Sequence, residues 1–308
     1  MTVCIAAICD DGVTLVLAAD RMITAGDMEF EIPGLSKKSE KASPLKTVPL
    51  NSHIVAITAG DAGFQADAIE HLFPKVKSAG GGPGSLFSSI SVRDVATLYL
   101  DFCNEQRKIA TNSVLAPYGL NVESCVEKQR SLSEQFVRWI TSEVEDIRER
   151  IGDPVLFCGI DATGAHIILS DGSALSSCDP FGFAAIGSGG EHAESQFMLG
   201  GHTRLATMAE TVLLTYVAKK RSEVAPGVGE LTDMFIVSPN GVYYVRPHEL
   251  ERLHAAYRKL EAGQTRSLVK AKAEITAYVN QLQEQAKKLS PPSRPPIEPP
   301  PAAQPGSG

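Results

Sequence analysis

The first twenty residues contain two short apolar runs separated by a polar turn. Residues 2–9 (TVCIAAIC) and 13–20 (VTLVLAAD) lie on either side of Asp10-Asp11-Gly12. Apolar runs of this length around an Asp-Gly pair predict a β-hairpin. Similar patterns predict a second hairpin, with strands at 155–161 and 166–171 and a turn at Ala162-Thr163-Gly164, and a third over 234–245 that turns at Pro239-Asn240-Gly241. Single strands are predicted at 52–59 and at 183–190, where the strand runs into a glycine-rich turn.

Predicted helices lie between these strands and divide them into blocks along the chain. Apolar residues recur three or four positions apart in the predicted helices, which cover about 61–76, 91–111, 131–150, a segment starting near 191, and 203–221. Strands and helices do not alternate strictly along the chain. This order favours an α+β fold, in which antiparallel sheets are covered by helices, over a parallel dinucleotide-binding sheet.

The composition changes after Gly263. Apolar residues then recur every seven positions, at Leu268, Ile275, Leu282 and Leu289. This spacing predicts a helix that either packs on its own domain or forms a short coiled-coil seam. From Ser290 the proline-rich sequence SPPSRPPIEPPPAAQPGSG predicts a disordered tail. We therefore expect one domain over 2–262, a helical extension over 263–289 and a disordered tail over 290–308.

The bulk composition narrows the class of protein. The 308 residues are 43% hydrophobic, enough for a sizeable core, and carry a formal net charge of -7. An acidic balance disfavours a nucleic-acid partner, which needs a clustered basic surface. No run of 18 apolar residues and no signal peptide are present, so we expect no membrane partner and a cytoplasmic location. The six cysteines lack CxxC and zinc spacings, which predicts reduced thiols and no metal site.

Thr2 is the first candidate for chemistry. It directly follows Met1, and its small side chain favours removal of that methionine. Removal frees an α-amino group beside the threonine hydroxyl. A hydroxyl is a weak nucleophile until a base takes its proton, and an amine with a pKa of roughly 7.7–8.0 can be that base. Because Thr2 also opens a predicted strand, its backbone should be held rigidly.

Three further residues complete a candidate constellation. Asp20 ends the strand that neighbours Thr2, and such a carboxylate can hold a lysine whose charge lowers the pKa of the hydroxyl. Lys46 precedes the next strand, and Gly60 ends that strand fourteen residues later. A glycine there can present its N–H to an oxyanion. Lys41 lies in the polar stretch SKKSEKASP, which reads as an exposed loop, so Lys46 is the preferred lysine.

Each of these residues also has a purely structural explanation. Asp20 and Arg21 can form an ordinary ion pair at a strand end, and Lys46 can be solvated. The sequence GSGG at 187–190 can be a plain turn, and it lacks the Lys-Ser/Thr ending of a phosphate-binding loop. Cys4 has no terminal amine and is expected to be a core cysteine.

Taken in order, several segments resemble the β subunits of the proteasome. They also resemble two bacterial relatives, the heat-shock proteasome-like protease and the Anbu peptidases. The resemblance covers about 2–250. Its segments are TVCIA at 2–6, LAADRMITAG at 17–26, the interval 46–60 with ITAGD, CGID at 158–161, FAAIGSGGEHA at 183–193 and LTDMFIVSPNGVYYV at 231–245.

The resemblance implies an N-terminal-nucleophile hydrolase fold. That fold is a four-layer α-β-β-α sandwich of two antiparallel sheets. By position, Thr2 matches the nucleophile and base, and Asp20 with Lys46 matches the buried acid–lysine pair. Ser188 matches the serine that orients the terminal amine, and Gly60 matches the oxyanion-hole glycine. The second acidic position of the family falls near two residues, Ser222 and Glu223.

The resemblance also implies an activity and partners. The expected function is a threonine endopeptidase that cleaves peptides or unfolded proteins through an acyl-enzyme, with no cofactor and no metal. Family members assemble into homo-oligomeric rings, and an ATPase or other regulator would be a further partner. Two alternatives stay open: an amidase acting on small acyl-amino compounds, and a non-catalytic subunit that only forms rings.

Overall fold

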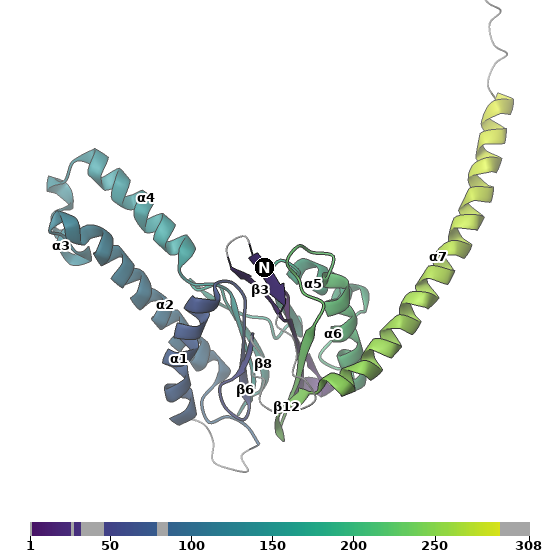
Figure 1. Ribbon diagram of the computed structural model, residues 1–308, viewed down its shortest axis with the longest axis horizontal. Coiled ribbons are helices and arrows are strands. Elements are labelled where there is room, and N and C mark those ends of the chain that lie inside the picture. Colours follow the sequence, from purple (N-terminus) through teal and green to yellow (C-terminus); the bar gives the residue numbers. More distant parts are fainter. Residues whose placement is uncertain (1, 26–27, 32–45, 79–85, 290–308) are drawn as a thin grey trace, which may run out of the picture. The chain divides into compact units, whose positions relative to one another are not determined.

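The structure is a computed structural model, and its described part leaves out residues 1, 26–27, 32–45, 79–85 and 290–308. The expected tail over 290–308 and the alternative lysine, Lys41, therefore lie outside the described residues. The chain divides into two compact units, 1–257 and 258–308. The first unit is α+β and contains two five-stranded antiparallel sheets (Figure 1).

The first sheet is built around the predicted amino-terminal hairpin. Its strands, in spatial order, are β10 (Phe183–Ile186), β1 (Cys4–Cys9), β2 (Thr14–Asp20), β11 (Thr232–Ser238) and β12 (Gly241–Val245). The turn between β1 and β2 is a 3-10 turn in which Asp10, Asp11 and Gly12 all have positive φ angles, of 51°, 57° and 81°. The predicted β1–β2 and β11–β12 hairpins are both confirmed.

The second sheet contains the strand that ends next to Gly60. Its order is β5 (Thr47–Pro49), β6 (Ile54–Thr58), β7 (Val155–Asp161), β8 (Gly164–Ser170) and β9 (Leu175–Ser177). A separate two-stranded sheet pairs β3 (Met22–Ala25) with β4 (Met28–Glu31). The sequence predicted β6, β7 and β8. It did not predict β3, β4, β5 or β9, which have three or four residues each.

The two large sheets pack face to face through an apolar core. In β1, Cys4, Ala6 and Ile8 point into this core, where they meet residues of β6 and β7 such as Val55 and Leu156. The intervening residues of β1 belong to a second cluster on the outer face of the same sheet. Because successive side chains of a strand point to opposite faces, burial of all six β1 residues requires a layer on each side.

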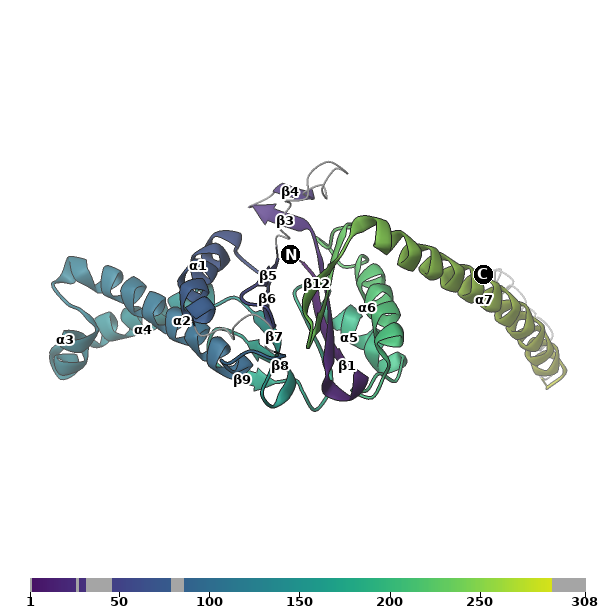
Figure 2. The same ribbon diagram turned by 90° about the horizontal axis from the view of Figure 1, so that it is seen from below.

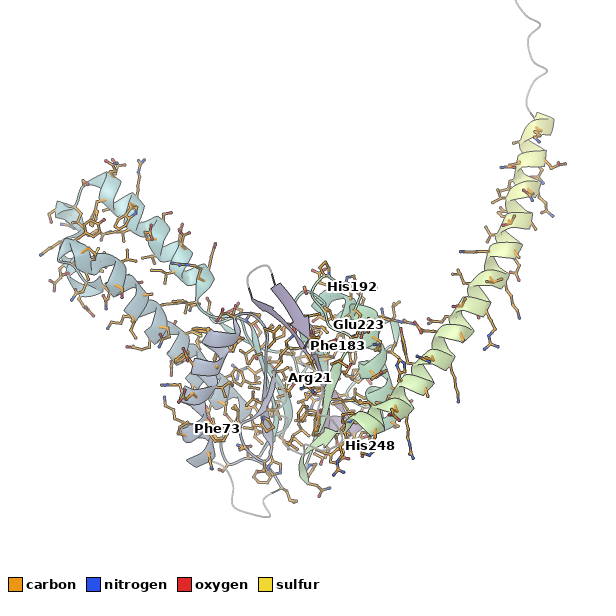
Figure 3. All side chains as sticks on the ribbon, viewed as in Figure 1. Arg21, Phe73, Phe183, His192, Glu223 and His248 are labelled. Carbon is orange, nitrogen blue, oxygen red and sulfur yellow. The ribbon has the colours of Figure 1, made fainter. Side chains whose placement is uncertain are left out.

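Helices form these outer layers (Figure 2). Those on the second sheet are α1 (Ala62–Ser78) and α2 (Val92–Leu115), and those on the first sheet are α5 (Gly190–Leu199), α6 (Met208–Ser222) and the first turns of α7 (Pro247–Leu289). Within the first unit, the layers run helix, sheet, sheet, helix. Figure 3 shows the side chains that fill the spaces between these layers.

The helix ends follow local capping signals. The Thr207 hydroxyl accepts a hydrogen bond from the Glu210 N–H, and the Glu210 carboxylate accepts one from the Thr207 N–H. This capping box starts α6 at Met208, later than the position 203 that periodicity predicted. The predicted helices at 61–76, 91–111 and 131–150 correspond to α1, α2 and α4 (Glu134–Arg150). The short α3 (Val122–Glu127) was not predicted, and α7 already includes residues 247–262.

A half-buried histidine ties the β7–β8 turn to the connection before β10. Nδ1 of His166 is 2.7 Å from the Asp179 carboxylate, and Nε2 is 3.3 Å from Asp161. The hydrogen bond to Asp179 raises the pKa of His166; burial and the charge of Arg204 oppose this, while the charges of both carboxylates add to it. The protonated imidazolium is therefore the form that the fold stabilises.

We expect His166→Gln to destabilise the fold in a pH-dependent way. A raised folded-state pKa gives a stabilising contribution that is complete below the unfolded pKa of about 6.5 and is lost as pH rises through the folded pKa. The variant should lose about 1–2 kcal/mol of unfolding free energy at pH 5.5 and distinctly less at pH 8.5. Urea unfolding at both pH values measures this, with His192→Gln, at an exposed site on α5, as the control. An equal loss at both pH values would contradict the ionic role.

Candidate active site

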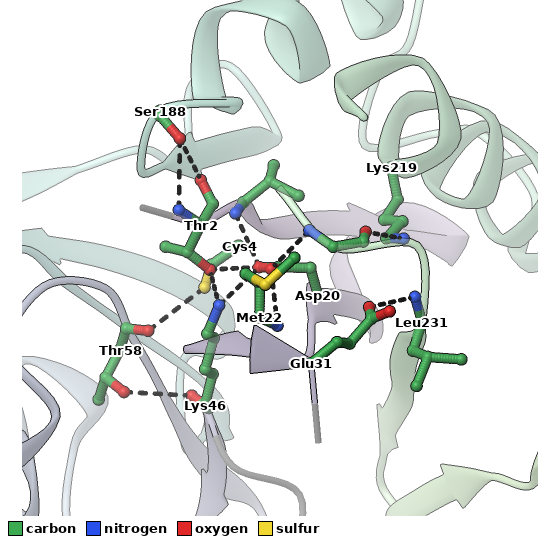
Figure 4. A network of polar contacts seen from close by, with 12 residues as sticks. Thr2, Cys4, Asp20, Met22, Glu31, Lys46, Thr58, Ser188, Lys219 and Leu231 are labelled. Atoms are coloured by element: carbon green, nitrogen blue, oxygen red, sulfur yellow. Dashed lines mark hydrogen bonds and ion pairs between the residues drawn. The ribbon is translucent and has the colours of Figure 1, made fainter. Parts of the chain in front are cut away.

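Four predicted polar side chains meet where the ends of the two large sheets face each other (Figure 4). Thr2 precedes β1, Asp20 ends β2, and their strands are paired, with the Asp20 N–H donating to the Val3 carbonyl at 3.2 Å. Lys46 immediately precedes β5 in the opposite sheet, and Ser188 follows β10. The packing of the sheets thus brings together residues that are up to 186 positions apart in sequence.

Asp20 is the centre of this group. Its side chain is only 1% exposed, and both carboxylate oxygens accept hydrogen bonds. The donors to Oδ1 are the Lys46 ammonium at 2.8 Å, the Val3 N–H at 2.9 Å and the Thr2 hydroxyl; the donors to Oδ2 are the N–H groups of Met22 and Gly229, each at 3.0 Å. A buried carboxylate with this many donors is stabilised in its ionised form.

The pKa of Asp20 reflects two opposing effects. Burial by itself raises the pKa of this carboxyl. The positive charge of Lys46 and the hydrogen bonds from Lys46, Thr2 and Gly229 lower it, and their combined effect is larger, so the pKa lies below its ordinary value. Asp20 is consequently a carboxylate at neutral pH and the counterion of Lys46.

Lys46 joins the carboxylate to the candidate nucleophile. Its Nζ donates to Asp20 and also contacts the hydroxyl oxygen of Thr2. Its backbone is fixed by β6, because the Thr58 N–H donates to the Lys46 carbonyl at 2.8 Å. A positive charge beside a hydroxyl favours the alkoxide and lowers the pKa of that hydroxyl. Asp20 pairs with Lys46, whereas Arg21 pairs with Asp233 at 3.1 Å.

Ser188 and its glycine neighbours hold the main chain of Thr2. Ser188 Oγ lies 3.3 Å from both the nitrogen and the carbonyl oxygen of Thr2 and 3.0 Å from the Pro226 carbonyl. Gly187 has a φ of +88°, and a Cβ there would lie 2.4 Å from the Thr2 carbonyl oxygen. The GSGG sequence therefore fits this site because its backbone approaches Thr2 more closely than a larger residue would allow.

Gly60 lies at the end of β6, in the wall of the same cleft as Thr2. Its φ is +109°, and a Cβ at this position would collide with the Asp153 carboxylate at 2.2–2.5 Å. That carboxylate also accepts the Asp61 N–H at 2.7 Å and so holds the turn. Within the described part of the chain, the Gly60 N–H has no hydrogen-bond acceptor.

The cleft beside Thr2 has a volume of about 610 Å³. Thr2, Lys46 and Gly60 line one part of it, and most of the remaining lining is apolar. The apolar part includes Val48 from β5 and, from α1, Ala62, Ala66, Ile69 and Phe73. A space of this size and character can accept the apolar side chain of a ligand while its reactive group lies against Thr2.

The two candidates for the second acidic position do not bond to this group. The Ser222 hydroxyl donates to the Ala218 carbonyl of its own helix at 2.8 Å. The Glu223 carboxylate instead accepts from the ammonium groups of Lys219 and Lys220, at 2.5 and 2.6 Å. The acidic residue next to the site is Asp233, which lies beside Ala19 in the β2–β11 ladder; burial raises its pKa, while Arg21 opposes this effect.

Sequence reasoning missed the contribution of the segment 223–231. Gly229 donates to Asp20, and Pro226 accepts from Ser188. Both contacts use main-chain atoms in a stretch without hydrophobic periodicity, so no side-chain pattern marked them. Gly227 and Gly229 were the only signals, because closely placed glycines often accompany tight backbone approaches.

Cys4 is not positioned as a competing nucleophile. Its side chain is fully buried, and its thiol donates to the Thr58 carbonyl at 3.4 Å. Burial raises the pKa of this thiol to about 12, so the reactive thiolate is scarce at neutral pH. The prediction of a buried core cysteine is confirmed.

Two other features, a metal-binding cluster and a membrane-spanning helix, are absent from the described residues. No set of three or more histidine, cysteine, aspartate and glutamate side chains is grouped there in a way that could bind a metal ion. Within the same residues, no helix combines the length and apolar character that crossing a membrane requires. In comparisons with known proteins, no family model matches the chain, and no curated protein matches it either.

Proposed function

We propose that this chain is a threonine peptidase of the proteasome β-subunit type, with Thr2 as its nucleophile after removal of Met1. The observation that carries the proposal is the position of the Lys46 ammonium, which contacts the Thr2 hydroxyl and lies 2.8 Å from the Asp20 carboxylate. This arrangement opens onto a cleft that can receive a substrate side chain. The helix-sheet-sheet-helix layering agrees with the N-terminal-nucleophile hydrolase fold and supports the same proposal.

The proposed reaction is acyl transfer to Thr2. The freed α-amino group takes the hydroxyl proton, and Lys46 stabilises the developing negative charge on Oγ1. The hydroxyl oxygen attacks the substrate carbonyl, and the Gly60 N–H donates to the oxyanion. The amine returns the proton to the leaving nitrogen, and water then releases the acyl group from Thr2. Ser188, which lies 3.3 Å from the Thr2 nitrogen, orients the amine.

The polar group of Thr2, Asp20 and Lys46, together with the adjoining cleft, favours a peptide substrate. The apolar wall formed by α1 suits an apolar side chain on the acyl side of the cleaved bond. The two alternatives to this proposal are an amidase that acts on small molecules and a non-catalytic subunit. Assembly into a homo-oligomeric ring belongs to the proposal, since family members restrict access to their sites in this way.

Thr2→Ala should abolish peptide hydrolysis and leave the fold intact. The variant lacks the nucleophile, so turnover of peptidyl-coumarin amides should fall by about 10³-fold or more, whereas Thr2→Ser should keep part of the activity. Circular dichroism checks the fold. The intact mass of the active protein should lack Met1, and a peptide epoxyketone should modify Thr2 covalently. Full activity in the alanine variant, or an active protein that retains Met1, would refute the mechanism.

Lys46→Ala should lower turnover by about 10²-fold or more, because the charge beside the Thr2 hydroxyl is lost. Lys46→Arg keeps a cation for the buried Asp20, yet it should also fail, since a planar guanidinium does not replace a compact ammonium in a tight site. The arginine variant therefore separates catalytic loss from the instability of an unpaired buried charge. Lys41→Ala should be nearly silent. An inactive Lys41→Ala together with an active Lys46→Ala would overturn the assignment.

The apolar cleft predicts a preference for peptides with an apolar side chain before the cleaved bond, and a charge placed in the cleft should weaken that preference. Ala66 is an exposed residue of α1 in the cleft wall, so Ala66→Asp adds a charge there without disturbing the core. We expect kcat/KM for peptides with leucine or phenylalanine before the cleaved bond to fall by about tenfold, because an apolar group would then meet a carboxylate. Peptides with lysine at that position are the internal control and should improve. An unchanged ratio between the two substrates would show that the cleft does not bind this side chain.

A further inference from the structure

Lys219 is a charged residue that the proposed reaction does not use, although it lies close to the site. It belongs to α6, and its side chain is 0% exposed. A buried ammonium is tolerated only when its donors are satisfied, and an ammonium has three of them. The three partners of Lys219 are the Glu223 carboxylate at 2.5 Å and the main-chain carbonyls of Gly229 and Glu230, each at 2.8 Å.

These carbonyls belong to the segment 223–231, which connects α6 to β11. The same segment reaches the candidate site through other main-chain atoms: Gly229 donates to Asp20 at 3.0 Å, and Pro226 accepts from Ser188 at 3.0 Å. Gly229 is thus held at both of its polar atoms, with its N–H on Asp20 and its carbonyl on Lys219. Glu31 fixes the end of the segment by accepting the Leu231 N–H at 2.5 Å.

Burying a charged group at this position has a cost for the fold. Burial lowers the pKa of Lys219 to about 8, although Glu223 and Asp20 oppose this effect and Lys220 adds to it. Because the folded-state pKa lies below the unfolded value of about 10.4, the charged form costs the fold free energy at neutral pH. That cost disappears only above the unfolded pKa. A long apolar side chain would avoid it, but would leave the two carbonyls without a donor.

We propose that Lys219 is a positioning residue: by holding the carbonyls of Gly229 and Glu230, it keeps the Gly229 N–H on Asp20 and so maintains the carboxylate that orients Lys46 toward Thr2. This inference rests on the proposed function for its catalytic consequence. Its structural part, the hold on Gly229, does not depend on that function. Lys219 itself has no contact with Thr2 or Lys46 and is absent from the cleft lining, so its effect is indirect.

Lys219→Met and Lys220→Met are a matched pair of variants of the full chain. Lys220 binds the same Glu223 oxygen but no main-chain carbonyl of the described segment. Hydrogen exchange followed by mass spectrometry reports on the Gly229 amide, and steady-state kinetics report on the reaction. Lys219→Met should speed exchange at Gly229 and lower kcat, each by about tenfold or more, with KM within about twofold, since the cleft is untouched. Lys220→Met should change neither quantity.

The outcomes separate this inference from the proposed function. Unchanged exchange at Gly229 in Lys219→Met overturns the inference, as does faster exchange with an unchanged kcat in an active protein. A wild-type protein without hydrolase activity refutes the proposed function, while the exchange data still decide whether Lys219 holds Gly229.

A second measurement serves if Lys219→Met does not fold. A neutral amine has only two N–H groups, and the Glu223 carboxylate is the strongest of its three acceptors, so one carbonyl loses its donor above about pH 8. In the wild type, protection of the Gly229 amide relative to its intrinsic exchange rate should therefore fall between pH 7 and pH 9. Protection of Met234 and Phe235 in β11 should stay constant. Constant protection at Gly229 would overturn the inference.

Discussion

The buried carboxylate of Asp20 imposes the constraint on which the rest of the site depends. Its charge is almost completely removed from water, so hydrogen-bond donors must replace the lost hydration. The donors come from the start of the chain, the residue before β5 and the segment before β11. Satisfying one carboxylate therefore fixes how three separate segments meet. The removal of any donor changes the balance between the burial that raises the Asp20 pKa and the contacts that lower it.

The face-to-face packing of the sheets makes this solvation possible. Asp20 ends a strand of one sheet and Thr2 precedes the neighbouring strand, whereas Lys46 precedes a strand of the other sheet. The ion pair and the contact with the hydroxyl therefore both join one sheet to the other. The core clusters on the two faces of β1 leave that strand little freedom to shift. A slip by one residue would exchange its inner and outer faces and would move Thr2 away from Lys46.

Whether a strand or helix was predicted correctly depends on how strongly its local sequence specifies it. The three hairpins and the helices α1, α2 and α4 have regular apolar spacing over many residues, and they were predicted close to their observed positions. The last helix, α7, begins at Pro247, well before the predicted residue 263. The strands β3, β4, β5 and β9 are too short for a periodic signal, although each pairs with a strand that is its neighbour in sequence. For α6, periodicity placed the start too early because the capping box at Thr207 decides where the helix begins.

By itself, the sequence determined the blocks of strands and helices. It singled out Thr2, Asp20, Lys46 and Gly60 by their chemistry at predicted strand ends, and Ser188 by the family resemblance alone. Only the tertiary structure decided that the side chains of Thr2, Asp20 and Lys46 contact one another, that Ser188 binds the main chain of Thr2, and that Ser222 and Glu223 bond elsewhere. It alone revealed the parts played by Gly229, Pro226 and Lys219. The physical reason is that these contacts use main-chain atoms of the aperiodic segment 223–231, or a lysine of α6 that is buried against that segment. Such interactions are specified by where separate segments pack rather than by the residues along any one of them.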